Sequence, residues 1–112
     1  MRIDHYSFGK IIIERRIYTS DVLIFPDRVI SPWWRKEGHS LHMEDLEEVL
    51  REKPEVLVIG SGYSRAMEVP EDLVKELAIE GIRVVVKGTP EAVGIYNILN
   101  VPRKTAALHL TC

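Results

Sequence analysis

Two glycine-containing segments, Gly60-Ser61-Gly62 and Lys87-Gly88-Thr89, are the first places where this sequence could bind a ligand. Glycines let backbone N–H groups approach a phosphate or carboxylate closely, and Lys87 would add a positive charge. Each segment follows an apolar run. We therefore expect each to lie at the carboxyl end of a buried strand, where α/β proteins bind ligands. With Arg65, the two segments would line one crevice for a small anion.

The same residues also have a purely structural explanation. The dinucleotide-binding pattern G-x-G-x-x-G would need a third glycine at position 65, which is Arg65. A tight turn at Gly60-Ser61-Gly62 and an N-terminal helix cap at Thr89 would account for both segments without a ligand. The sequence leaves both interpretations open.

The run Trp33-Trp34-Arg35, followed by His39, is a second candidate site. Consecutive side chains of a strand or turn point in different directions, so one indole can be buried while the other stays exposed. A guanidinium stacked on an indole would contribute about 0.5–2 kcal/mol. The cluster of Trp33, Trp34, Arg35 and His39 is therefore either a structural corner or an interaction surface, since Trp and Arg dominate interface hot spots.

Neither a catalytic nor a metal-binding motif is complete in this sequence. His39 and His42 are three residues apart but have no third ligand nearby in the sequence. His109 and Cys112 would face opposite sides of an extended strand. Ser61 does not lie in a G-x-S-x-G nucleophile motif. We therefore predict no catalytic residue, no metal and no cofactor, and we favour a protein that is not an enzyme.

Length and charge limit the classes of partner. The 112 residues suit one domain, residues 1–112, and 46% of them are hydrophobic. The net charge of −2 gives no electrostatic reason to expect nucleic acid or an anionic membrane as partner. No apolar stretch approaches the roughly 20 residues of a membrane span, and no signal peptide is visible. A single cysteine, Cys112, suits a reducing compartment, so we expect a cytoplasmic protein.

The amide content is unusually low. The sequence has no Gln, only Asn97 and Asn100 carry the Asn side chain, and the 12 Glu far exceed the 5 Asp. Depletion of thermolabile amides together with many Glu, Lys and Arg is typical of thermophile proteins. We therefore expect the protein to melt above the mesophile range of roughly 45–65 °C.

The first third of the sequence predicts β-hairpins. Short β-branched runs occur at Ile11–Ile13, Val22–Phe25 and Val29–Ile30, and the turn pairs Pro26-Asp27 and Ser31-Pro32 interrupt them. Their close spacing favours antiparallel pairing.

The remaining two thirds predict alternating helices and strands. Apolar residues recur at helical spacing after Met43, and Pro54 would end that helix. Prolines, acidic residues and glycines set the other helix ends. The expected elements are a helix from Met43, a strand at Val56–Ile59, a helix from Pro70 to Gly81, a strand at Ile82–Val86, a helix from Thr89 to Asn100 and a strand at Ala106–Leu110. This order predicts an α/β domain whose parallel strands share one sheet.

Several stretches, spread over nearly the whole chain, resemble a known family. They are Tyr6-Ser7-Phe8-Gly9-Lys10-Ile11, Trp33-Trp34-Arg35 with Gly38-His39, Asp45-Leu46, Val58-Ile59-Gly60-Ser61-Gly62, Thr89 with Ala92, Tyr96-Asn97-x-Leu99 and Ala107-Leu108-His109-Leu110-Thr111-Cys112. The chain resembles a small uncharacterised family that includes mitochondrial complex I assembly factor 3 and the adipogenesis-associated domain protein. Arg65 departs from the family pattern, which often has a glycine there.

This resemblance implies a single three-layer α/β domain, in which an N-terminal β-hairpin region packs with a mixed, largely parallel sheet covered by helices. It implies no established catalytic residue, and it implies assembly or interaction roles for some eukaryotic members. The chain is similar to the stand-alone prokaryotic form. We therefore predict a non-enzymatic interaction or assembly domain that binds a protein partner or a second copy of itself. The alternative is a small-anion-binding protein or enzyme that uses the glycine crevice.

Overall fold

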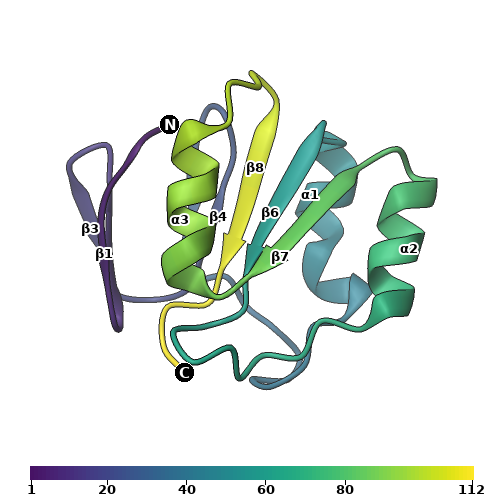
Figure 1. Ribbon diagram of the computed structural model, residues 1–112, viewed down its shortest axis with the longest axis horizontal. Coiled ribbons are helices and arrows are strands. Elements are labelled where there is room, and N and C mark those ends of the chain that lie inside the picture. Colours follow the sequence, from purple (N-terminus) through teal and green to yellow (C-terminus); the bar gives the residue numbers. More distant parts are fainter.

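A five-stranded mixed sheet forms the centre of the molecule, in the strand order β5-β4-β8-β6-β7 (Figure 1). The computed structural model describes residues 1–112. The strands are β4 (Val22–Ile24), β5 (Val29–Ile30), β6 (Val56–Gly60), β7 (Arg83–Lys87) and β8 (Lys104–Leu108). β6 pairs in parallel with both β7 and β8, whereas β4 pairs antiparallel with β8 and β5. The predicted α/β class with a mixed sheet is therefore confirmed.

β6 lies inside the sheet, between β8 and β7. All five of its residues are buried, as expected for an apolar run covered on both faces. β7 begins one residue later than the sequence suggested, and β8 begins two residues earlier, at Lys104 rather than Ala106. Leu110 is nevertheless buried beyond the end of β8, and this burial explains why the apolar pattern continued past the strand.

The N-terminal residues form a separate three-stranded antiparallel sheet of β1 (Ile3–Ser7), β2 (Lys10–Ile13) and β3 (Arg16–Tyr18). Its tight turns contain Gly9, with φ of +76°, and the pair Glu14 and Arg15, with φ of +48° and +69°. The β-branched runs of the first third do not simply pair in succession. β2 stays in the small sheet, and β4 instead joins β8 from the end of the chain.

The helical segments are the 3-10 helix η1 (Met43–Leu46), α1 (Glu47–Glu52), α2 (Glu71–Ile79) and α3 (Thr89–Ile98). His42 and Asp45 form a capping box at the start of η1, and Gly81, with φ of +85°, follows the end of α2. The expected cap at Thr89 is wrong, because Gly88 is the N-cap and Thr89 is the first helical residue. The longest helix, α3, has ten residues, about half of what a bilayer span needs, and no helix qualifies as one.

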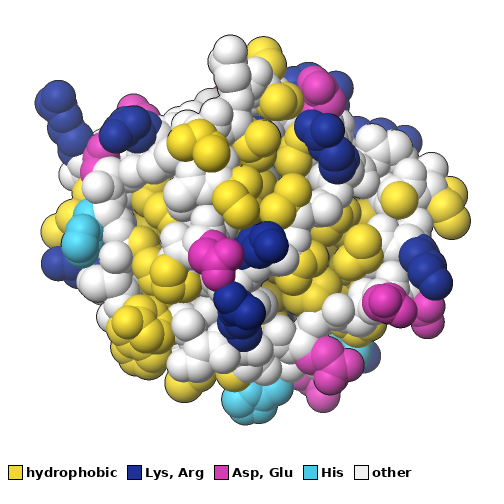
Figure 2. All heavy atoms as spheres, viewed as in Figure 1, with side chains coloured by type: hydrophobic (Ala, Val, Ile, Leu, Met, Phe, Trp, Pro, Cys, Tyr) yellow, Lys and Arg dark blue, Asp and Glu magenta, His cyan; other side chains and the backbone are white.

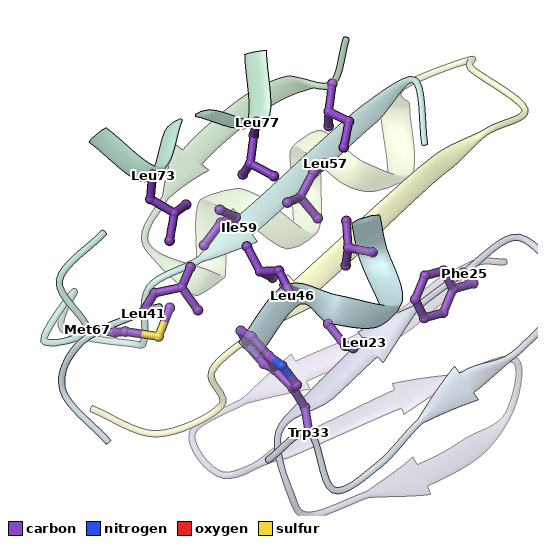
Figure 3. Packing of buried hydrophobic residues seen from close by; sticks show 13 residues of the cluster. Leu23, Phe25, Trp33, Leu41, Leu46, Leu57, Ile59, Met67, Leu73 and Leu77 are labelled. Atoms are coloured by element: carbon purple, nitrogen blue, oxygen red, sulfur yellow. The ribbon is translucent and has the colours of Figure 1, made fainter. Parts of the chain in front are cut away.

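Two hydrophobic clusters lie on opposite faces of the central sheet. On one face, η1, α1 and α2 cover β6, and Figure 3 shows Leu46, Leu73 and Leu77 directed at Leu57 and Ile59. On the other face, α3 and the three-stranded sheet cover the alternate strand residues, including Val56, Val58, Ala106 and Leu108. The strand alternation therefore divides the core into two halves.

Candidate functional site

The two adjacent tryptophans have opposite environments. Trp33 is only 5% exposed, and its Nε1–H donates to the carbonyl oxygen of Asp45 at 2.9 Å. Trp34 is 82% exposed. Trp33 is therefore part of the core, and Trp34 is the only indole that a partner could contact.

An open hollow of about 330 Å³ lies beside Trp34. Its lining residues are Pro32, Trp33, Trp34, Arg35, Lys36 and Gly38. His39, which the sequence grouped with this cluster, is exposed but does not line the hollow. Its carbonyl oxygen instead accepts a hydrogen bond from the Glu68 N–H at 2.8 Å.

Arg35 links the tryptophan cluster to two residues that the sequence did not suggest. Its guanidinium carbon lies 4.9 Å from the centre of the Trp33 ring, which confirms the expected stacking. Nη1 donates to Asp21 Oδ2 at 2.5 Å, and Nη2 lies 3.1 Å from His109 Nδ1. The Arg35 side chain is only 6% exposed, so its charge is compensated inside the protein.

Asp21 is the hub of this cluster. Oδ2 also contacts His109 Nδ1 at 2.8 Å, and Oδ1 accepts from the Leu110 N–H at 2.7 Å. Burial raises the pKa of the Asp21 carboxyl, but the hydrogen bonds from His109, Leu110 and Arg35 outweigh it, so the pKa lies below 3.8. Asp21 is therefore an anion that ties the loop at Arg35 to the segment at Leu110. We refer to Asp21, Arg35 and His109 as the Asp21 clasp.

The clasp orients the His109 ring. Its Nδ1 lies 2.8 Å from the acceptor Asp21 Oδ2 and 3.1 Å from the donor Arg35 Nη2, and a protonated Nδ1 would donate to Asp21. No protein group is hydrogen-bonded to Nε2. An oriented imidazole of this kind can act as a base when a nucleophile lies beside Nε2. No serine, threonine or cysteine side chain forms that hydrogen bond in this structure.

The two glycine segments lie next to each other, but none of the four hollows of the surface opens between them. Gly62 and Thr89 are adjacent, because the Gly62 N–H donates to Thr89 Oγ1 at 2.9 Å and the Thr89 hydroxyl donates to the His109 carbonyl at 2.6 Å. A Cβ on Gly60 would come within 2.8 Å of Thr89 Oγ1, so only glycine allows this approach. Arg65 crosses above Gly88 and pairs with Glu91 at 2.6 Å.

Residues 111 and 112 pack against Gly62 and the residues that follow it. The Tyr63 N–H donates to the Thr111 carbonyl at 2.7 Å, and the N–H groups of Ser64 and Ala66 donate to the oxygen of Cys112 at 3.1 and 3.0 Å. Gly62 has φ of +111°, and a Cβ there would lie 2.4 Å from the carbonyl carbon of Cys112. The glycine is therefore required by the close approach of residues 111 and 112.

The other anion-site residues are also partly engaged. Ser61 Oγ and the Ser61 N–H both donate to the Lys87 carbonyl, at 3.3 and 2.9 Å. The Lys87 side chain is exposed and has no ion-pair partner. The structure thus brings together the residues that we grouped, and most of their polar groups bond to one another.

Asp21 and His109 are the residues that the sequence analysis did not connect to the cluster. They lie 88 positions apart, and no local pattern relates them. The one available indication was that a buried guanidinium needs a carboxylate, and the sequence does not say which carboxylate supplies it.

The fold and site define a class of small α/β domains in which a mixed five-stranded sheet gathers glycine loops and a buried ion cluster at one edge. The family model described as "Protein of unknown function (DUF498/DUF598)" matches residues 3–111. The chain belongs to this family.

Solved structures support the same assignment. The protein MT938 is 32% identical, with 99% of this chain and 98% of that chain covered and a TM-score of 0.80. A conserved hypothetical protein from Pyrococcus horikoshii OT3 is 27% identical over 100% of both chains, with a TM-score of 0.80. A Bordetella pertussis protein described as a Mth938-like domain shares the fold at 21% identity, covering 97% of this chain and 85% of that chain, with a TM-score of 0.75.

Proposed function

We propose that this chain is a non-enzymatic interaction domain that binds a protein partner, or a second copy of itself, through the Trp34 surface. The observation that carries the proposal is the 82% exposed indole of Trp34 beside the hollow at Pro32 and Lys36. Large exposed aromatic side chains next to a concave surface are the usual anchors of protein interfaces.

The loop around Trp34 is held in place from both sides. Trp33 is buried in the core, Arg35 is held by Asp21, and the Lys36 N–H donates to Asp45 Oδ1 at 2.8 Å. A surface fixed in this way loses little conformational entropy on binding. This rigidity supports a binding role for Trp34.

The proposed role is assembly, in keeping with the resemblance to mitochondrial complex I assembly factor 3. The proposal does not extend to complex I itself, and we expect this chain to act in the cytoplasm. Its partner is a protein rather than a nucleic acid, because the net charge is −2.

Replacing Trp34 with alanine tests the proposal. We expect Trp34→Ala to abolish complexes that the wild type forms with itself or with proteins of its source cell. The free energy of unfolding should stay within about 0.5 kcal/mol of the wild-type value, because the indole is exposed. Sedimentation velocity and affinity capture measure the complexes, and calorimetry measures the free energy of unfolding.

Ile17→Ala is the matched control, because Ile17 is 63% exposed on β3, away from this loop. Equal complexes for wild type and Trp34→Ala would contradict the proposal. Unfolding of Trp34→Ala would mean that the cluster has a structural role only.

Small-anion binding in the glycine crevice stays as the second candidate. The N–H groups of Ser64 and Ala66 converge on the Cys112 oxygen, and a carboxylate or phosphate oxygen that took its place would accept the same two hydrogen bonds. A thermal-shift screen with phosphates, nucleotides and carboxylic acids tests it. A ligand should give saturable stabilisation of about 2.7 kcal/mol at a hundredfold excess over Kd. No stabilisation across the panel would remove this candidate.

A further inference from the structure

An apolar groove lies between the helices that cover one face of the sheet. Its volume is about 260 Å³, and it is lined by Met43 of η1, Leu50 of α1, and Glu76, Ile79 and Glu80 near the end of α2. Drug-sized ligand pockets are usually about 300–1,000 Å³. The groove therefore suits one or two side chains of a protein partner better than a free small molecule.

Ile79 makes the groove unusual. Its side chain is 83% exposed, although Met43 and Leu50 beside it pack partly against the core. Ile79 lies three residues after Glu76 on α2 and therefore on the same helix face. Ile79, Met43 and Leu50 together form a continuous apolar surface, and acidic residues lie at its edge.

The stretch of sequence that contains the groove residues is rich in acidic side chains. Residues 41–80 contain eleven acidic and four basic side chains, whereas the rest of the chain contains six acidic and eleven basic ones. Figure 2 shows acidic side chains over the first turn of α2, and Glu76 and Glu80 add two more near the other end of this helix, at the groove. The net charge of −2 of the whole chain thus conceals an acidic segment.

The acidic residues of the groove are only partly neutralised. Glu80 pairs with Lys53 at 3.6 Å, and both side chains are substantially exposed. Glu76 is exposed, and no lysine or arginine lies within ion-pair distance of it. A lysine or arginine of a partner that lay beside Glu76 would provide the ion pair that Glu76 lacks within this chain.

We propose that the groove between α1 and α2 binds a basic amphipathic helix of a protein partner. Aliphatic residues of that helix would contact Met43, Leu50 and Ile79, and its lysines or arginines would lie beside Glu76. Helices that pack in a groove between two helices use this combination of apolar anchors and flanking charges. The site is separate from Trp34, so the proposal does not depend on the Trp34 surface.

A synthetic peptide provides the test. The probe is a labelled 14-residue amphipathic peptide with leucine on one helical face and lysine on the other, and fluorescence anisotropy measures its Kd. We expect saturable binding to the wild type and about fivefold or greater weakening for Ile79→Ser. The variant should fold normally, because Ile79 is exposed. Glu76→Gln should weaken binding about twofold, and added salt should reduce that effect.

Matched controls separate a groove from general attraction between opposite charges. Ile98→Ser is the control variant, because Ile98 is 81% exposed at the end of α3 on the other face, and it should leave the Kd unchanged. A peptide with serine in place of leucine keeps the charge and should not bind.

Three results would overturn the proposal. They are equal binding by the serine peptide, equal Kd values for the wild type and Ile79→Ser, and self-association of the wild type that Ile79→Ser abolishes. The last would make a second copy of this chain the occupant. Trp34→Ala should bind the peptide as the wild type does, so failure here and failure of the Trp34 proposal are distinguishable.

Discussion

The two faces of the central sheet are equally apolar but are covered differently. α3 and the three-stranded sheet cover one face, and Asn97 joins these two covering elements. Its Nδ2 donates to the Ile3 carbonyl at 2.7 Å, and its Oδ1 accepts from the Ile3 N–H at 3.0 Å. The other face is covered by η1, α1 and α2, which leave the groove at Ile79 open.

Under the proposal for the groove between α1 and α2, the covering elements rather than the core residues decide where a partner binds. Both clusters contain fully buried strand residues, such as Leu57 on one face and Val58 on the other. Only the α1–α2 side combines a groove, an exposed aliphatic side chain and an excess of acidic residues. Five substitutions test how firmly the covering elements are held.

Leu77→Ala should have the largest effect on the free energy of unfolding. Leu77 is fully buried under α2, and a Leu→Ala change in a core costs about 2–5 kcal/mol through lost burial and a residual cavity. Ile79→Ala, two residues further along the same helix, should change stability by less than about 0.5 kcal/mol. Urea unfolding measures both. Similar values for the two variants would mean that α2 is not held by its buried face.

Asp21→Asn should have the second largest effect on the free energy of unfolding. The Asp21 clasp joins the two covers, because Arg35 stacks on Trp33 of one cluster and Leu110 belongs to the other. Removing the carboxylate leaves a guanidinium that is 6% exposed without its anion, at a cost of about 1–3 kcal/mol. Hydrogen exchange should show faster opening near both Arg35 and Leu110. Faster exchange at only one of them would contradict a clasp.

The clasp also predicts a pH dependence. The folded-state pKa of Asp21 lies below its ordinary value of 3.8, so its stabilising contribution is fully present above that value. The contribution is lost as the pH falls through the lower folded-state pKa. Wild type should therefore lose more stability than Asp21→Asn on acidification below about pH 4. Parallel acid titrations of the two proteins would refute this if both lost stability equally.

Tyr96→Phe should change the free energy of unfolding less than Asp21→Asn does. The Tyr96 hydroxyl is buried with no hydrogen-bond partner, and burial raises its pKa to about 12. Removing an unpartnered polar atom should leave stability unchanged or raise it by up to about 1 kcal/mol. Thermal unfolding measures the change. A clear loss of stability would indicate that the hydroxyl has a partner in solution.

Trp33→Phe is the matched comparison on the other face. The Trp33 N–H donates to Asp45, so this variant loses a satisfied hydrogen bond as well as ring area. We expect it to be less stable than Tyr96→Phe. Equal stabilities for Trp33→Phe and Tyr96→Phe would mean that a hydrogen-bonded polar group and an unpartnered one contribute alike on a buried aromatic side chain.

The sequence predicted the elements that local patterns define. Val56–Ile59 and the helix after Pro70 follow directly from apolar spacing and from proline and glycine positions. It did not predict that β4 pairs with β8, because those strands are about 80 residues apart and β-branched runs pair equally well with several neighbours.

The sequence predicted that the glycine segments lie close together, but it did not predict their contacts. Glycines 60, 62 and 88 and Thr89 do lie together, since strand ends gather at one edge of a sheet. That residues 111 and 112 lie against Gly62 depends on the path of the chain after β8, which no local pattern encodes. The choice of Trp33 as the buried indole likewise depends on the three-dimensional position of Asp45.

β7 lies at the edge of the central sheet, and its composition bears on solubility. Val84, Val85 and Val86 form a short apolar segment with one unpaired backbone edge. Two such strands pairing antiparallel about Val85 would place Arg83 of one opposite Lys87 of the other, so like charges would oppose fibril-like growth. Replacing both cations with neutral residues would convert a protected edge into a template for aggregation.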